Sequence, residues 1–404
     1  MIRPYFLFLA LLLLVGCQTT PSRQTEDLTA TPWSEISETA KGETVTWMMW
    51  QGDPLINRYV ADYLAPAIKE HFDITLEVVP GQGNQIVSQL TAELEAGKES
   101  SEIDMMWING ETFFQLRQIN GLYGPFVQQL PNNELIDWDN PFIHTDFQQP
   151  VDGFECPWGN VQLAIIYNSD QVEEVPQTLE DLEKWVTAHP GKFTIGSDFT
   201  GMTLLKSWLI HLAGGPGSLD GPFNEEKYLK ASQEMWTYLN RIKGNFWNHG
   251  TTFPTDVAQM HQLFVNGELW FTMSNNDTEV DNKINQGFFP ESSRAYVPSY
   301  GTIQNTHYLG IAKRSAHKEA AMTVINFMLS PEAQWHKNHP DVWGDGTVLD
   351  LKKVPTEWQE RFKDVPGHQY SPKRADIQSR ALQEPAPEYM IRLFQDFRKY
   401  VIEA

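Results

Sequence analysis

Cysteine is scarce in this chain, which has only Cys17 and Cys156 among its 404 residues. Two cysteines cannot build a multi-bridge disulfide framework, and a chain of this length does not need one. Basic residues are also few, since 30 Lys and Arg stand against 52 Asp and Glu and leave a net charge of -22. Such an acidic chain repels phosphate backbones, so nucleic acid is excluded as a partner. The length predicts two domains, and the 41% apolar content argues against disorder.

Long hydrophobic runs are missing apart from one at the start of the chain. The apolar stretch 5–15, preceded by Arg3, is too short to cross a bilayer as a helix, which needs about 20 residues. It is typical of an export signal, and Leu14-Val15-Gly16-Cys17 has the pattern of a bacterial lipoprotein cleavage site. We predict that residues 1–16 are a signal peptide and that Cys17 is lipidated. An ordinary secretory signal with an incidental cysteine is the alternative, and Cys156 is expected in the core.

Residues 17–43 are rich in Thr, Ser and Glu and hold few large apolar side chains. Such a segment buries too little surface to offset its ordering entropy. We therefore predict a flexible tether between the membrane and a folded body that is exported to the periplasm.

Motifs of catalysis and of cofactor binding are missing from the sequence. Gly81-Gln82-Gly83 lacks a third glycine at position 86, and neither a phosphate-binding Gly-Lys-Ser/Thr nor the Gly-x-Ser-x-Gly elbow of hydrolases occurs. His336 and His339 lie near two Asp residues, and Asp277 starts a partial calcium-loop pattern. A solvated loop and a polar helix start explain these two groups better. We expect no enzyme activity, no metal and no cofactor.

Strand-like and helix-like segments alternate from residue 45 onward. Apolar strands are predicted at 45–50, 74–79 and 103–108, and a helix is predicted after each of them. This order indicates a parallel sheet with helical crossovers, in which ligands bind beyond the carboxyl ends of the strands. Further strands are predicted at 161–167, 193–196, 269–273 and 308–312. Further helices are predicted after a Thr178 cap with Asp181 at its third position, and at 202–212, 225–242, 257–265, 316–329 and 388–402.

Polar and aromatic side chains gather where the predicted strands end. In the first part of the chain, the segments that follow predicted strands are Trp50-Gln51-Gly52-Asp53, Gln82-Gly83-Asn84 and Asn109-Gly110-Glu111. In the second part, the corresponding segment is Asp198-Phe199-Thr200-Gly201. Helix N-termini offer free N–H groups, and Trp50 and Trp158 offer flat apolar faces, which together suit a small solute. The alternatives stay open that Asp53, Asn84 and Thr200 are capping residues and that Trp50 belongs to the core.

Three stretches resemble the solute-binding proteins of ATP-driven (ABC) importers. They are the lipoprotein start with its tether, the segment 102–110 (Glu-Ile-Asp-Met-Met-Trp-Ile-Asn-Gly), and the segment 308–334, which ends in Leu-Ser-Pro-Glu-Ala-Gln. The last motif is typical of the maltose-type and iron/thiamine-type branches. Within the family, the chain is most similar to the YnjB-like branch, which is linked to thiamine transport. The resemblance covers roughly residues 44–340.

The resemblance implies a type II periplasmic-binding-protein fold, an α/β architecture of two Rossmann-like lobes joined by a hinge. It implies a first lobe at 44–155 plus about 299–340, a second at 156–298, and a helical extension at 341–404 that packs on one lobe. The chain is expected to cross between the lobes near 155–162 and 297–308. The predicted solute contacts are Trp50, Gln51, Asp53, Gln82, Gly83, Asn84, Asn109, Glu111, Trp158, Gln162, Asp198, Phe199, Thr200, Asn275, Asn276, Asn305 and Tyr308.

We therefore expect a monomeric, lipid-anchored protein that captures a small solute between two lobes and delivers it to a membrane permease. Trp50 and Trp158, together with Asp53, Glu111 and Asp198, would suit thiamine or a related cationic heterocycle through stacking and charge-assisted contacts. A sugar is the second candidate, because Trp faces with Asn, Gln and Asp also suit carbohydrate. A secreted enzyme such as a glycoside hydrolase and a passive surface lipoprotein are the alternatives from other classes.

Overall fold

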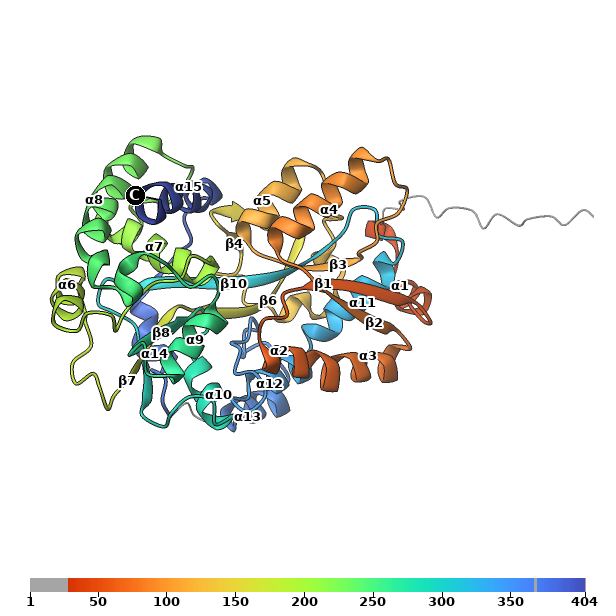
Figure 1. Ribbon diagram of the computed structural model, residues 1–404. Coiled ribbons are helices and arrows are strands. Elements are labelled where there is room, and N and C mark those ends of the chain that lie inside the picture. Colours follow the sequence, from red (N-terminus) through yellow and green to blue (C-terminus); the bar gives the residue numbers. More distant parts are fainter. Residues whose placement is uncertain (1–27, 367–368, 404) are drawn as a thin grey trace, which may run out of the picture.

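The molecule is divided into two lobes that two long strands connect (Figure 1). A computed structural model describes residues 28–366 and 369–403. We call lobe I the part built on β1 (Thr44–Met49), β2 (Thr75–Pro80) and β3 (Met105–Ile108), and lobe II the part built on β7 (Ala164–Asn168), β8 (Phe271–Ser274) and β9 (Ser293–Tyr296). The connecting strands β6 (Glu155–Gln162) and β10 (Thr302–Ile311) are buried along their whole lengths. The predicted two-lobed α/β fold class is confirmed.

The sheet of lobe I has the strand order β11-β10-β3-β1-β2, and β6 pairs with β10. Because β1 runs parallel to both β2 and β3, their carboxyl ends meet at one edge, as the alternating pattern predicted. Strand β10 enters antiparallel to β3, with Tyr308 opposite Ile108. The residues after β1, β2 and β3 therefore point toward lobe II.

The crossover helices of lobe I begin directly after the strands. They comprise α2 (Pro54–Arg58) with a π-helical turn at Tyr59–Leu64, α3 (Ala65–Phe72), α4 (Gly83–Glu95) and α5 (Gly110–Gln118). Asp53 caps α2, because its side chain accepts hydrogen bonds from the backbone N–H groups of Leu55 and Ile56, and Pro54 occupies the first turn. The start of α2 thus agrees with the capping alternative for Asp53.

Lobe II combines the antiparallel sheet β8-β7-β9 with α6 (Leu179–Ala188), α7 (Phe199–Leu212), α8 (Glu225–Ile242), α9 (Val257–Val265) and α10 (Glu279–Asn285). The predicted capping box at the start of α6 is present, with Thr178 and Asp181 bonding each other's backbone. The predicted strand at 193–196 is wrong. Its residues are buried, but they pack against the 246–254 loop, and the N–H of Trp247 bonds the Phe193 carbonyl, so no ladder forms.

The tether prediction for residues 17–43 is wrong from residue 28 onward. Residues 28–30 form a short 3-10 helix, and α1 spans Trp33–Thr39. Three apolar side chains of the segment, Leu28, Ile36 and Ala40, are buried in the core of lobe I, and the half-buried Trp33 packs against this core, where α1 contacts α11 (Lys318–Met328). Three well-placed apolar groups are enough because the lobe supplies the rest of their surroundings. Cys17 lies outside the described residues.

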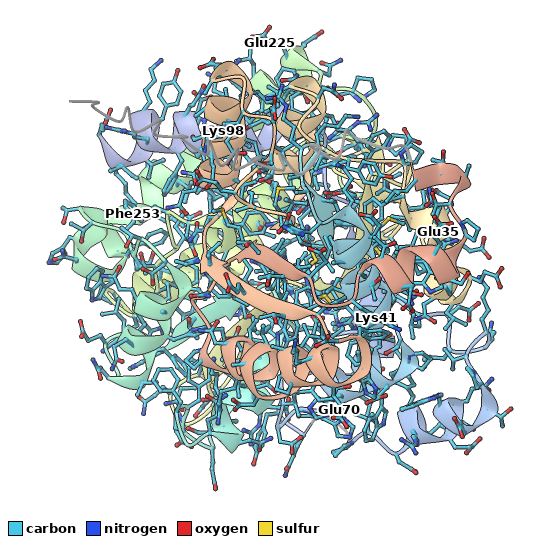
Figure 2. The ribbon with its side chains drawn as sticks, turned by 90° about the vertical axis from the view of Figure 1, so that its right-hand side faces the viewer. Glu35, Lys41, Glu70, Lys98, Glu225 and Phe253 are labelled. Atoms are coloured by element: carbon cyan, nitrogen blue, oxygen red, sulfur yellow. The ribbon has the colours of Figure 1, made fainter. Side chains whose placement is uncertain are left out.

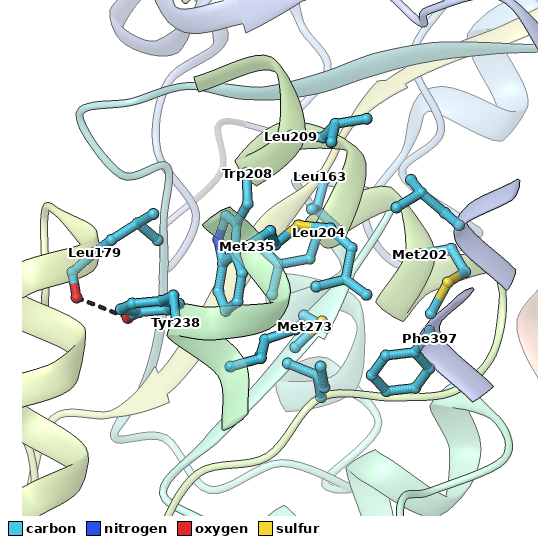
Figure 3. Packing of buried hydrophobic residues seen from close by; sticks show 14 of the residues in the cluster. Leu163, Leu179, Met202, Leu204, Trp208, Leu209, Met235, Tyr238, Met273 and Phe397 are labelled. Carbon is cyan, nitrogen blue, oxygen red and sulfur yellow. Dashed lines mark hydrogen bonds between the residues drawn. The ribbon is translucent and has the colours of Figure 1, made fainter. Parts of the chain in front are cut away.

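The C-terminal segment contacts both lobes. It follows α12 (Pro331–Asn338) and includes α13 (Thr356–Lys363), α14 (Arg374–Ile377), β11 (Ala381–Leu382) and α15 (Pro387–Phe397), which continues as a π-helical turn to Ile402. Trp343 and Val348 join the core of lobe I, whereas Leu393 and Phe397 of α15 join the core of lobe II. Figure 3 shows Phe397 beside Met202 in this second core. The exact domain limits stay a prediction.

Charged side chains cover the outside of both lobes. Figure 2 labels Glu35, Lys41, Glu70, Lys98 and Glu225, and all five are exposed. Within the described part of the chain, no helix is both long and apolar enough to cross a membrane.

Candidate functional site

The seam between the lobes lies along one edge of β10. On this edge Tyr308–Ile311 pair with β3 of lobe I, and Thr302–Ile303 pair with β11, while β6 occupies the opposite edge. Gln304, Asn305 and Thr306, which lie between these ladders, line a small cavity of about 10 Å³, which has room for about one water. Its lining comes from the hairpin of β4 (Thr145–Asp146) and β5 (Gln149–Pro150), from β10 and from the chain after β11.

Four ionisable side chains meet beside this cavity, and we call them the acid–lysine cluster: Glu111, Asp146, Lys206 and Glu384. They come from α5, the β4–β5 hairpin, α7 and the segment after β11, so both lobes contribute. Lys206, which has no exposed surface, pairs with Oε2 of Glu384, and Nδ2 of Asn305 donates to Oε1 of Glu384 at 3.1 Å. The cluster therefore holds three carboxyl groups against one ammonium.

Two carboxyl oxygens of the cluster have no compensating group. Oε2 of Glu111 and Oδ2 of Asp146 are buried and find no hydrogen-bond partner among the described residues. Burial raises the pKa of Glu111, against the effect of Lys206. Burial also raises the pKa of Asp146 well above its usual range, with a further rise from the neighbouring Glu384 and Glu111 carboxylates. The site is thus short of positive charge or protons.

Aromatic rings enclose the lysine of the cluster. The Lys206 ammonium lies 4.3 Å from the centroid of the Phe147 ring and 5.2 Å from that of Phe199. A Cβ at Gly110 would overlap the Phe147 ring, so the glycine next to Glu111 allows this close approach. Rings with adjacent carboxylates are the surroundings in which proteins hold organic ammonium groups.

A second contact between the lobes is the ion pair of Asp53 in lobe I with Lys283 in α10. Lys283 also lies 3.4 Å from Glu279, whose Oε1 is 3.2 Å from Nε2 of His261. Although burial alone would raise it, the pKa of Glu279 is lowered because Lys283 and His261 favour its charged form. The pKa of Lys283 is raised although burial alone would lower it, since Glu279 and Asp53 favour its charged form. This chain of charges joins α2 to α10.

The loop 343–346 makes a third contact between the lobes. The Thr278 hydroxyl donates to the Gly344 carbonyl at 2.6 Å, and the Asn282 amide donates to the Trp343 carbonyl. Nearby, the Arg374 guanidinium pairs with Asp277 at 2.6 Å. Together with the Asp53 pair, these contacts hold the lobes closed in the described conformation.

Besides Thr200, four of the predicted contacts are buried inside the protein, where they contact other residues of the chain. Trp158 has no exposed surface and packs edge-on against Trp47 and Trp107, at ring-centroid distances of 5.4 and 4.9 Å. Gln162 donates through its backbone to Asp277 at 3.0 Å, and the Tyr308 hydroxyl donates to a backbone carbonyl. Asn305, the fourth, binds Glu384 in the acid–lysine cluster. The structure therefore places Trp158 in the core of lobe I.

The other predicted contacts lie at the ends of strands or at helix starts, and many of them have local roles. Asp198 caps α7, Gln82 caps α4 within a capping box, and the Asn275 amide donates to the Thr200 hydroxyl at 3.1 Å. Of the residues in this group, the structure brings Glu111 and Phe199 to the acid–lysine cluster. The rest are half-buried or exposed: Trp50, Gln51, Asp53, Gly83, Asn84, Asn109 and Asn276.

The sequence reasoning missed Asp146, Lys206, Glu384 and Lys283. One signal for Lys206 was available in the sequence. It is the only charged residue in Met202–Ile210, a part of α7 whose other side chains are apolar or small. A lysine in such a run needs a buried partner. No pattern pointed to Glu384, which follows β11 far along the chain. The described residues contain no group of three or more His, Cys, Asp or Glu that would hold a metal ion.

Comparisons with known proteins agree with this two-lobed arrangement. The profile of the family described as bacterial extracellular solute-binding protein matches residues 58–341. The chain is 35% identical over 338 residues to protein YnjB of Escherichia coli (strain K12), which covers 83% of this chain and 87% of that protein. The chain belongs to the bacterial extracellular solute-binding protein family. It is the solute-binding component of an ABC importer, and the family implies that it is exported.

More distant relatives of this solute-binding protein are also similar. It is 23% identical over 292 residues to the putrescine-binding periplasmic protein SpuD of Pseudomonas aeruginosa (strain UCBPP-PA14), covering 67% of this chain and 72% of that one. The solved spermidine/putrescine substrate-binding protein PotD of Streptococcus pneumoniae has a TM-score of 0.61 and 17% identity, covering 89% of this chain and 99% of that chain. At that identity the solved structure shows only that the fold is shared.

Proposed function

We propose that this solute-binding protein captures a small organic cation in the seam between its lobes. The observation that carries the proposal is the pair of buried oxygens without a hydrogen-bond partner, one on Asp146, which lines the cavity, and one on Glu111, which interacts with Asp146. Buried carboxylates without a partner are costly, and a cationic group with N–H donors would supply both the charge and the hydrogen bonds. Lys206 supplies one ammonium for three carboxyl groups, which leaves the cluster acidic.

Thiamine or a related cationic heterocycle is the first ligand to test. Phe199 at the cluster and the half-buried Trp50 offer aromatic faces. The relatives named for putrescine and spermidine support a cation of some kind, so these two amines belong in the same comparison. A sugar, the second candidate, is supported less well because it brings no positive charge to the cluster.

Capture requires the lobes to separate and close again. The cavity of about 10 Å³ is far too small for any of these solutes, so entry requires the contacts along the seam to open. A solute that binds both lobes then shifts the population toward the closed form. We further propose that Cys17 carries a lipid anchor and that the closed monomer delivers its solute to the membrane permease.

Isothermal titration calorimetry tests the choice of ligand. Thiamine, putrescine and spermidine are titrated into the mature protein, with maltose and phosphate as the neutral and anionic comparisons. We expect saturable binding of a cation and none of maltose or phosphate. Glu111→Gln should weaken the cation by about tenfold or more, because a charged hydrogen bond is lost.

The control for this titration is Glu234→Gln, which changes an exposed carboxylate of α8 and should leave the affinity unchanged. Binding of maltose or phosphate with no binding of any cation would refute the proposed ligand class.

A further inference from the structure

We propose that the C-terminal segment is part of the solute site and that the Lys206–Glu384 pair sets how much positive charge the bound solute carries. This inference rests on the proposed capture of a cation. Lys206 acts as a built-in cation that pairs with Glu384, so the solute is matched to the carboxyls that have no such partner, namely Glu111 and Asp146, with the buried Glu155 next to Asp146.

Hydrogen bonding in the cluster supports this division of charge. Both oxygens of Glu384 are used, one by the Lys206 ammonium and one by the Asn305 amide. In contrast, Glu111 and Asp146 each keep a buried oxygen that no described residue contacts through a hydrogen bond. Asp146 is only 3% exposed and lines the cavity, so its free oxygen lies where a bound group would be placed. The pair and the two free carboxyls therefore have different roles.

The position of Glu384 makes the C-terminal segment responsible for this charge. Strand β11 pairs with β10 at Thr302–Ile303, and this pairing carries the chain directly into the seam after Leu382. The Gln148 amide then donates to the Glu384 backbone carbonyl at 2.8 Å, which fixes the segment against the β4–β5 hairpin. The family profile ends at residue 341, well before this segment. Glu384 therefore lies outside the residues that this profile matches.

The surroundings of Lys206 resemble those of a bound ligand. Its ammonium lies near the rings of Phe147 and Phe199 and pairs with one carboxylate. Without the ammonium, Glu384 would become a third carboxylate free to pair with a solute. Without Glu384, the ammonium would turn to Glu111 and Asp146 and compete with the solute for them. Each single change therefore alters the preferred ligand charge in a direction that can be stated beforehand.

Two amines of equal chain length measure this preference. Putrescine is a four-carbon chain with an ammonium at each end, and n-butylammonium is the same chain with one. In Lys206→Met, we expect the ratio of putrescine affinity to n-butylammonium affinity to rise by about tenfold or more. In Glu384→Gln, both amines should weaken by about tenfold, with the larger loss for putrescine.

The double variant Lys206→Met/Glu384→Gln is the matched control, because it removes both charges and leaves the cluster with the same net charge as in the wild type. Its affinity ratio should return to within about threefold of the wild-type ratio. If Lys206→Met does not fold, the ratio of the two affinities is compared between the double variant and Glu384→Gln, because these two proteins differ only at Lys206.

The outcomes separate this inference from the proposed function. If the wild type binds a cation but the ratio is unchanged in Lys206→Met, the charge-setting role is overturned and the proposed function stands. If the wild type binds neither amine nor any other cation, both are overturned.

Discussion

The ammonium of Lys283 in α10 pairs with the carboxylate of Asp53, the residue that caps α2, and so an ion pair links lobe II to lobe I. Its side chains are only 6% and 13% exposed, so solvent screens the pair little. Asp53 thereby has two roles, because the same carboxylate holds the first turn of α2 and contacts the opposite lobe. Opening of the seam must break this pair.

Loss of the Lys283 ammonium should favour the open form. In Lys283→Met we expect a larger radius of gyration by small-angle X-ray scattering in the absence of solute, because a contact present only in the closed form is removed. The buried Asp53 and Glu279 carboxylates lose a partner, so the free energy of unfolding should fall by about 1–3 kcal/mol.

Lys69→Met is the control for this experiment, since Lys69 pairs with Asp73 on the exposed surface of α3. An unchanged radius of gyration in Lys283→Met would show that the Asp53 pair does not hold the lobes together.

The buried carboxyl of Asp146 should make stability depend on pH. Its pKa is raised by burial and by the Glu384 and Glu111 carboxylates, against the effect of Lys206. Below the usual carboxyl pKa near 4, Asp146 is protonated in both the folded and the unfolded protein, so its raised pKa costs no stability. As the pH rises through the raised pKa, the folded protein becomes less stable relative to the unfolded chain. The Tm of Asp146→Asn minus that of the wild type should therefore increase as the pH rises above about 4.

Titrating groups that do not interact with Asp146 cancel in this difference, and Asp220→Asn, on an exposed turn, is the matched control. A difference that is constant with pH would contradict the assigned shift.

Neighbouring residues of α15 should differ sharply in their effect on stability. Leu393 is fully buried in the core of lobe II, whereas Phe394 is 38% exposed. We expect Leu393→Ala to lower the free energy of unfolding by about 2–5 kcal/mol in urea titrations, because it leaves a cavity. Phe394→Ala should cost much less, and equal losses would mean that α15 does not pack as described.

Substitutions of the two tryptophans predicted to bind the solute should have different effects on affinity. Trp158 is buried against other rings, so Trp158→Phe should lower the Tm and leave the affinity of the folded protein unchanged. Trp50 is half-buried after β1, so Trp50→Ala should weaken the solute more than it lowers the Tm. Calorimetry measures the affinity and thermal unfolding measures the Tm of both variants. A loss of affinity in Trp158→Phe but not in Trp50→Ala would place Trp158 in the solute site and Trp50 outside it.

Local sequence signals predicted the fold well where short-range contacts decide the structure. The Thr178–Asp181 capping box and the Asp53 cap need only residues three positions apart, and both are present. The parallel pairing of β1 with β2 and β3 follows from the alternation of strands and helices. The α1 helix was missed because its stability comes from the core of lobe I and not from its own composition.

The candidate site was predicted only in part, because contacts between distant segments determine it. Glu111 was predicted from its place after β3, which is a local signal. Lys206 and Glu384 meet only because β11 pairs with β10 beside α7, and no periodicity in the sequence reports such a meeting. Trp158 was placed in the site because tryptophan suits both ligands and cores, and composition cannot separate the two.

Native mass spectrometry of the protein purified from its own cells tests the central proposal most directly. We expect each chain to carry one small organic cation, which is released on denaturation and is missing from Glu111→Gln purified in the same way. An anion or a neutral sugar in that position, retained equally by Glu111→Gln, would contradict capture of a cation by the acid–lysine cluster.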